Sequence, residues 1–87
     1  MIYQIFSIKD AQTGFNAPVL DTSEAAAMRG FRASLVQSYS DLKAMSVNLD
    51  ELSLYCFGTF DTESGAFDLL PLPKFLMAGS EDFIDEK

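Results

Sequence analysis

The segment 52–70 constrains the fold most strongly, because its pattern is typical of two strands joined by a tight turn. Apolar side chains recur at alternate positions of residues 52–60, which predicts a strand with one face in the core. The Asp-Thr-Glu-Ser-Gly stretch that follows ends at Gly65 and predicts a type I turn closed by a glycine in the left-handed region. Residues 66–70 are then the returning strand, which Pro71 is expected to end.

A helix is predicted over about residues 22–38. Asp21 is the expected N-cap, since Glu24 follows three residues later in a pattern similar to a capping box. The apolar face of this helix recurs at i, i+3 and i+7, at Met28, Phe31 and Leu35. One amphipathic helix of this kind is expected to cover one face of a sheet.

The remaining elements are shorter. Residues 2–8 carry apolar groups on both faces, which predicts a central strand. Residues 10–18 contain a glycine and a proline and are expected to be a loop. Pro73 fits the first position of a short helix over residues 73–78, which Gly79 would end.

The predicted fold class is α+β, with elements in the order β-α-β-β and a short C-terminal helix. A small, partly antiparallel sheet of about three strands packs against the one main helix. We expect a single domain over residues 1–79 and an acidic C-terminal tail over residues 80–87. Three strands leave two open edges, and edge pairing between subunits predicts a homodimer.

The composition excludes several kinds of catalytic and metal site. The 87 residues include no histidine and one cysteine, so a Ser-His-Asp or Cys-His site cannot form. A structural zinc site needs four nitrogen or sulfur ligands, and no intrachain disulfide is possible. No apolar run approaches the roughly 20 residues of a membrane span. We therefore expect no cofactor, no metal, no enzymatic activity, no membrane contact and an intracellular location.

The cations of the main helix are the candidate nucleic-acid contacts. Arg29 and Arg32 lie i, i+3 on the side of the helix away from its apolar face, and Lys9 or Lys43 is expected to join them in an anion-binding patch. The alternative is that both arginines are solvated charges paired with neighbouring carboxylates. The chain has 6 Lys and Arg against 13 Asp and Glu, a net charge of −7, which favours this second interpretation.

The tail holds the candidate partner contacts. Phe83 and Ile84 form an apolar pair within an acidic segment. They are expected either to dock into the basic-rimmed pocket of a partner or to fold back over the domain's own core. The 8 Phe and 3 Tyr residues leave a similar choice between core packing and stacking on unpaired bases.

Several stretches together resemble the small non-structural protein family of gokushoviruses, the single-stranded DNA microviruses (Microviridae) that infect bacteria. The stretches that carry the resemblance are Gln4–Ile8, Asp10, Gly14, Pro18, Ala27–Phe31 and Leu54–Gly65. The family pattern has an Ala-x-Arg-x-Phe helix, in which Arg29 matches the arginine, followed by a Gly-x-Phe-Asp hairpin. Residues 40–50 depart from the family pattern.

The resemblance implies a non-catalytic phage protein that is often described as DNA-binding. It implies a role in producing or packaging the single-stranded genome in the cytoplasm of the host bacterium. The partner would be single-stranded DNA. The resemblance carries over Arg29 alone, and the charge pattern adds Lys9 and Arg32 as the other expected contacts. The alternative is an acidic protein-interaction module that binds a basic replication or capsid protein through Phe83 and Ile84.

Overall fold

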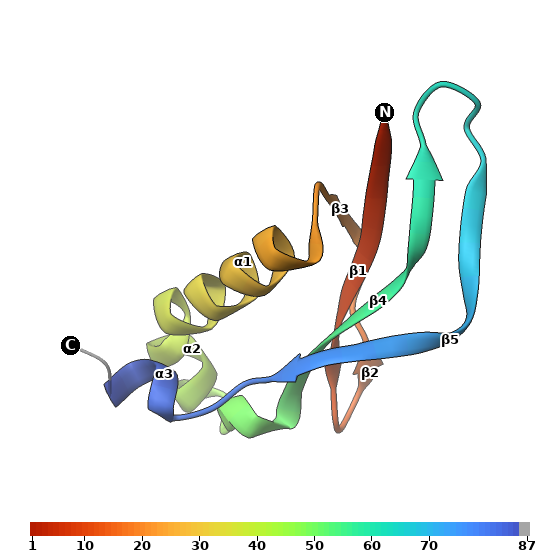
Figure 1. Ribbon diagram of the computed structural model, residues 1–87. Coiled ribbons are helices and arrows are strands. Elements are labelled where there is room, and N and C mark those ends of the chain that lie inside the picture. Colours follow the sequence, from red (N-terminus) through yellow and green to blue (C-terminus); the bar gives the residue numbers. More distant parts are fainter. Residues whose placement is uncertain (86–87) are drawn as a thin grey trace.

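The computed structural model describes residues 1–85, which form a curled antiparallel sheet with one main helix (Figure 1). The sheet has five strands in the order β2-β1-β4-β5, and β3 pairs with β1 beside β2. The strands are β1 (Ile2–Asp10), β2 (Gly14–Phe15), β3 (Val19–Asp21), β4 (Leu52–Asp61) and β5 (Phe67–Ala78). The helices are α1 (Glu24–Gln37), α2 (Tyr39–Ala44), the 3-10 turn Leu49–Glu51 and α3 (Asp82–Asp85).

The predicted three-stranded sheet packed on a helix is wrong, because residues 1–85 are mostly sheet and form five strands. Residues 10–18 are not only a loop: β2 lies in this segment, and β3 follows it. Both short strands form because they pair with the outer edge of β1. In the connection between them, the backbone N–H of Asn16 donates to the carbonyl of Ile8 at 2.8 Å.

The predicted helix over residues 73–78 is also wrong, because this segment is the second half of β5. The strand β4 pairs there with Lys74, Phe75, Met77 and Ala78. These long-range backbone hydrogen bonds override the local helix signal of Pro73. Pro71 does not end the strand either, because β5 is an edge strand, in which a missing N–H can face solvent.

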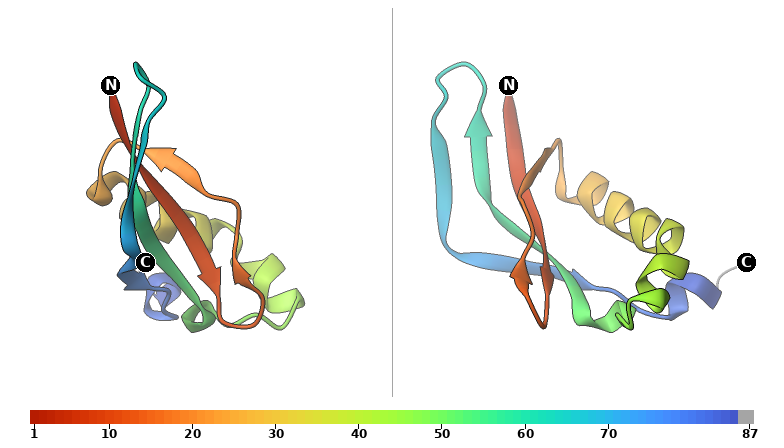
Figure 2. Two further views of the ribbon diagram at one scale, coloured as in Figure 1. Left: turned by 90° about the vertical axis from the view of Figure 1, so that its right-hand side faces the viewer. Right: turned by 180° about the vertical axis from the view of Figure 1, so that it is seen from behind.

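The prolines instead mark a bend in β5, and the right-hand view of Figure 2 shows the sharp turn between the two halves of this strand. Cys56 pairs with Lys74, whereas Gly58, only two residues later, pairs with Leu69. Residues 70–73 are therefore surplus to the pairing and form the corner between the two halves of the strand. This corner separates a hairpin arm, made of the end of β4 and the start of β5, from the rest of the sheet.

Helix α1 has the predicted apolar face but a different cap. Ser23 is the N-cap, and its hydroxyl accepts a hydrogen bond from the backbone N–H of Ala26 at 3.1 Å. Asp21, the expected cap, belongs to β3 and pairs with Gln4. The helix ends at Gln37, and a hydrogen bond from the Ser38 N–H to the Ser34 carbonyl, 2.9 Å long, closes it.

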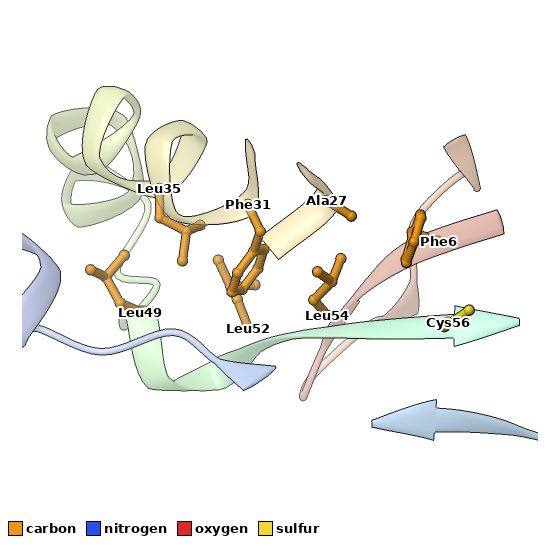
Figure 3. Close-up of a cluster of buried hydrophobic side chains, with 8 residues drawn as sticks. All are labelled: Phe6, Ala27, Phe31, Leu35, Leu49, Leu52, Leu54 and Cys56. Carbon is orange, nitrogen blue, oxygen red and sulfur yellow. The ribbon is translucent and has the colours of Figure 1, made fainter. Parts of the chain in front are cut away.

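The core lies between α1 and one face of the sheet (Figure 3). Its buried side chains come from β1, α1, the 3-10 turn and β4: Phe6, Ala27, Phe31, Leu35, Leu49, Leu52, Leu54 and Cys56. Cys56 is a buried free thiol packed as a small apolar group. This core uses one face of the sheet, and no helix formed by the described residues covers the other face. Within residues 1–85, no helix is long and apolar enough to cross a lipid bilayer.

Candidate functional site

Aromatic side chains gather on the sheet face that α1 does not cover. Leu54 and Cys56 of β4 point into the core, so Tyr55 between them projects from the opposite face. Phe75 of β5 pairs with Tyr55 across the strands. Phe15 of β2 pairs with Lys9, which lies on this same face. We call Phe15, Tyr55, Phe57 and Phe75 the outer aromatic face.

The rings of the outer aromatic face contact one another edge to face. The ring centroids of Phe15 and Tyr55 are 5.3 Å apart, those of Phe15 and Phe57 5.1 Å, and those of Tyr55 and Phe75 5.6 Å. This arrangement is the one that aromatic quadrupoles favour. Phe15 is 43% exposed and Phe75 54% exposed, so the cluster is held in place yet open to solvent.

Lys9 places the positive charge on this face. Its Nζ lies 5.5 Å from the ring centroid of Phe15 and 6.0 Å from that of Tyr55, within cation–π range. The four carboxylates of the strands lie, by their register, on the other side of the sheet: Asp10, Asp21, Asp61 and Asp68. The face is thus apolar and slightly positive although the chain as a whole is acidic.

A hollow adjoins the outer aromatic face where the hairpin arm curls toward β2. It has a volume of about 310 Å³ and is lined mainly by apolar groups, including Ile5, Pro18, Phe57, Phe67 and Leu69. Ser7 on its wall is buried, and its hydroxyl is satisfied there because it donates to the carbonyl of Asn16 at 2.6 Å. The hollow is large enough and apolar enough for a flat ring to enter.

The structure does not bring the three predicted nucleic-acid residues together. Lys9 lies beside the outer aromatic face, whereas Arg29 and Arg32 lie on α1, on the other side of the sheet and core. The two arginines line a shallow groove of about 450 Å³ with Val36 and Phe83. Any anion held by the arginines would therefore be bound at a different surface from one held by Lys9.

The predicted partner residues fold back onto the domain. Phe83 and Ile84 are half-buried and pack against the core cluster. The guanidinium carbon of Arg32 lies 4.9 Å from the ring centroid of Phe83, a cation–π contact that holds α3 against α1. The use of Phe83 and Ile84 as partner contacts remains a prediction.

Two groups with a shifted pKa, Asp61 and Lys74, lie away from the outer aromatic face. The pKa of Asp61 is lowered, chiefly because the backbone N–H of Glu63 donates to its carboxylate at 2.9 Å in the hairpin turn. The pKa of Lys74 is raised by its hydrogen bond and ion pair with Glu24, at 2.9 Å. Both are exposed structural contacts. Among residues 1–85, no cluster of three or more His, Cys, Asp or Glu residues is placed to hold a metal ion.

Sequence reasoning missed Phe15 and Phe75 as members of this surface. Phe15 was expected in a loop and Phe75 in a helix, so neither had a face that could be assigned. The available signal was the pair Tyr55 and Phe57, which the alternation of β4 places opposite the core side chains.

One comparison with known proteins gives a match. A family model described as Phage ORF5 protein matches residues 3–82, which is most of the chain. No curated protein and no solved structure matches.

Proposed function

Since the chain belongs to the Phage ORF5 protein family, we propose that it is a non-catalytic accessory in the replication or packaging of a phage single-stranded DNA genome. It would act in the cytoplasm of the host bacterium and hold the DNA on the outer aromatic face. The resemblance to the gokushovirus family supports the single-stranded genome as the biological setting. The family match by itself supports only a small phage protein.

The observation that carries the proposal is the exposed aromatic cluster beside Lys9. Unpaired bases stack on aromatic side chains, and each stacked base contributes about 1–3 kcal/mol. Phe15 and Phe75 present open rings, and the neighbouring Tyr55 and Phe57 fix their positions through edge-to-face contacts. Lys9 supplies a cation for an adjacent phosphate, and the strand carboxylates point away.

This surface predicts binding by stacking more than by charge. The net charge of −7 opposes a polyanion, and Lys9 is the cation that the described strands place on this face. Each phosphate neutralised on a single strand steepens the dependence of log K on log salt by about 0.7. A face with one lysine is therefore expected to show a slope near that for a single phosphate.

The test is fluorescence anisotropy at low salt with a labelled oligothymidylate of about 16 nucleotides, long enough for one small domain. Phe75→Leu keeps an apolar side chain but removes the stacking ring, and it should weaken binding about 5- to 150-fold. Arg29→Gln is the matched control on the other side of the molecule and should leave binding unchanged. An abasic strand of the same length and charge should bind far more weakly.

Two results would refute the proposal. One is the absence of any anisotropy change at low salt, where the electrostatic contribution is greatest. The other is equal binding of the abasic and the base-containing strand, which would mean that the rings contact no bases. Loss of binding in Arg29→Gln with retention in Phe75→Leu would move the site to α1.

The second candidate function is an acidic module that binds a basic replication or capsid protein of the same phage. The net charge of −7 favours it. Because Phe83 and Ile84 pack on the core, deleting residues 80–87 would also expose apolar surface. Asp82→Asn is the cleaner variant, since it removes tail charge and keeps both side chains in place, and unchanged capture of the partner would argue against a role for this tail charge.

A further inference from the structure

Strand β5 is an open and unusually apolar edge. It has 12 residues and ends the strand order of the sheet, so no strand within the described residues pairs with one of its sides. Its residues from Phe67 to Phe75 are all exposed. The large apolar side chains among them are Phe67 (64% exposed), Leu69 (61%), Leu70 (42%), Leu72 (78%) and Phe75 (54%). Exposed edges of this kind are templates for pairing with another chain.

The sequence of this edge is complementary to itself about Pro71. Counting outward from Pro71, each residue meets one of matching character, in the pairs Leu70 with Leu72, Leu69 with Pro73, Asp68 with Lys74, and Phe67 with Phe75. Asp68 and Lys74 are the charged residues of β5, and they have opposite signs. A two-fold axis through the bend therefore sets each charge opposite its counterion.

The faces of the strand agree with this register. Directly opposed residues of an antiparallel pair must lie on the same face of the sheet. Phe67 pairs with Phe60 and Phe75 with Tyr55, which places both phenylalanines on the outer side. Asp68 pairs with Thr59 and Lys74 with Cys56, which places both charges on the α1 side. The complementarity thus holds for side-chain direction as well as for sequence order.

We propose that the occupant of the β5 edge is a second copy of this chain, paired antiparallel about a two-fold axis at Pro71. Two acidic chains repel one another over most of their surfaces, but β5 carries one acid and one base and is neutral. The interface is isologous, which means that each copy contributes the same surface. Assembly through this surface therefore stops at the dimer. Pro71 and Pro73 lack N–H groups, and side chains therefore carry more of the contact than the backbone does.

Pairing at this edge covers neither α1 nor the outer aromatic face, because both lie on the faces of the sheet and not along its edge. The two outer aromatic faces would then lie side by side in one larger sheet, each with its own Lys9. This inference does not depend on the proposed function, because the oligomeric state is measured without DNA. A dimer that binds no DNA would refute the proposed function alone, and a DNA-binding monomer would refute this inference alone.

The experiment is sedimentation equilibrium of the full chain and of two charge variants. Asp68→Lys sets lysine against Lys74 of the second copy, and Lys74→Asp sets aspartate against Asp68. Each change acts at both symmetric contacts and should weaken the homodimer about 5- to 30-fold. An equimolar mixture of the two variants should restore the dimer as a one-to-one heterodimer, which native mass spectrometry identifies by mass.

A third variant tests the apolar contact without touching the charges. Leu72 is 78% exposed, so Leu72→Glu should leave the folded chain intact by far-UV circular dichroism and weaken the dimer at least tenfold. Lys74→Asp also removes the ion pair between Lys74 and Glu24. If that variant fails to fold, Leu72→Glu still tests the interface.

Three results would overturn the proposal. The first is a wild-type chain that stays monomeric at the highest soluble concentration. The second is a mixture of charge variants that recovers no heterodimer. The third is a dimer that survives Leu72→Glu but is lost in Phe15→Ser, which would indicate pairing through the outer aromatic face.

Discussion

Gly58 is the position where a single methyl group should damage this fold most directly. It lies in β4 opposite Leu69, at the point where the hairpin arm meets the rest of the sheet. Its φ is +142°, a conformation that residues with a side chain rarely adopt. A Cβ built there would overlap the backbone carbonyl oxygen of Asp68 and lie 2.8 Å from the Cα of Leu69.

Two costs add in Gly58→Ala. The positive φ costs roughly 1–2 kcal/mol for a residue with a Cβ. Forcing an extra methyl into a packed site costs about 1–3 kcal/mol, and here the obstacle is backbone, which cannot rotate away as a side chain can. We therefore expect a loss of about 2–5 kcal/mol in the free energy of unfolding, a large part of the total for a small domain.

Urea denaturation followed by circular dichroism measures the effect. With a slope of about 1 kcal/mol per molar urea, the midpoint should fall by roughly 2–5 M, or the variant should be unfolded without denaturant. Gly30→Ala is the matched control. A Cβ at Gly30 meets nothing within 4 Å in the interior of α1, so the same substitution should stabilise by up to about 1 kcal/mol. Equal midpoints for the wild type and Gly58→Ala would refute this reasoning.

Two smaller predictions concern the start of α1 and the hairpin turn. Ser23→Ala should lower the free energy of unfolding, measured by urea denaturation, by about 1 kcal/mol, because α1 loses its side-chain cap. Asp21→Ala should lower it by less. A larger loss in Asp21→Ala than in Ser23→Ala would indicate that Asp21 is the cap. The lowered pKa of Asp61 means that its bond from the Glu63 N–H stabilises the fold above the ordinary pKa of 3.8 and is lost as pH falls through the lower folded value. Asp61→Asn should therefore flatten the acid end of the stability curve, and an unchanged curve would show that the turn contributes nothing.

The predictions that held are those that rest on local periodicity. The i, i+3, i+7 spacing identified Phe31 and Leu35 as the buried face of α1, because the helical repeat fixes which side chains share a side. The alternation in β4 correctly placed Leu52, Leu54 and Cys56 in the core for the same reason. Gly65 closes the hairpin at a φ of +75°, as the turn sequence predicts.

The predictions that failed concern segments whose structure is supplied by a distant neighbour. By local preference Pro73 favours the start of a helix. Residues 73–78 form a strand instead, because their backbone pairs with that of β4. Residues 10–18 were expected to be a loop, yet β2 forms within them by pairing with β1, and β3 follows them on the same edge of β1. The grouping of Lys9 with Arg29 and Arg32 failed because adjacency along a helix says nothing about which side of the sheet that helix will cover.

The chain by itself therefore determined the separate pieces: one amphipathic helix, a first strand, a hairpin, and a chemistry without histidine or disulfide. Only the tertiary structure decided that the sheet has five strands, that its uncovered face collects the exposed aromatic rings beside Lys9, and that β5 is left as a neutral edge. The physical reason is that strand pairing and layer packing join residues far apart in sequence. Local sequence preferences do not determine with which distant residues a given residue will pair or pack.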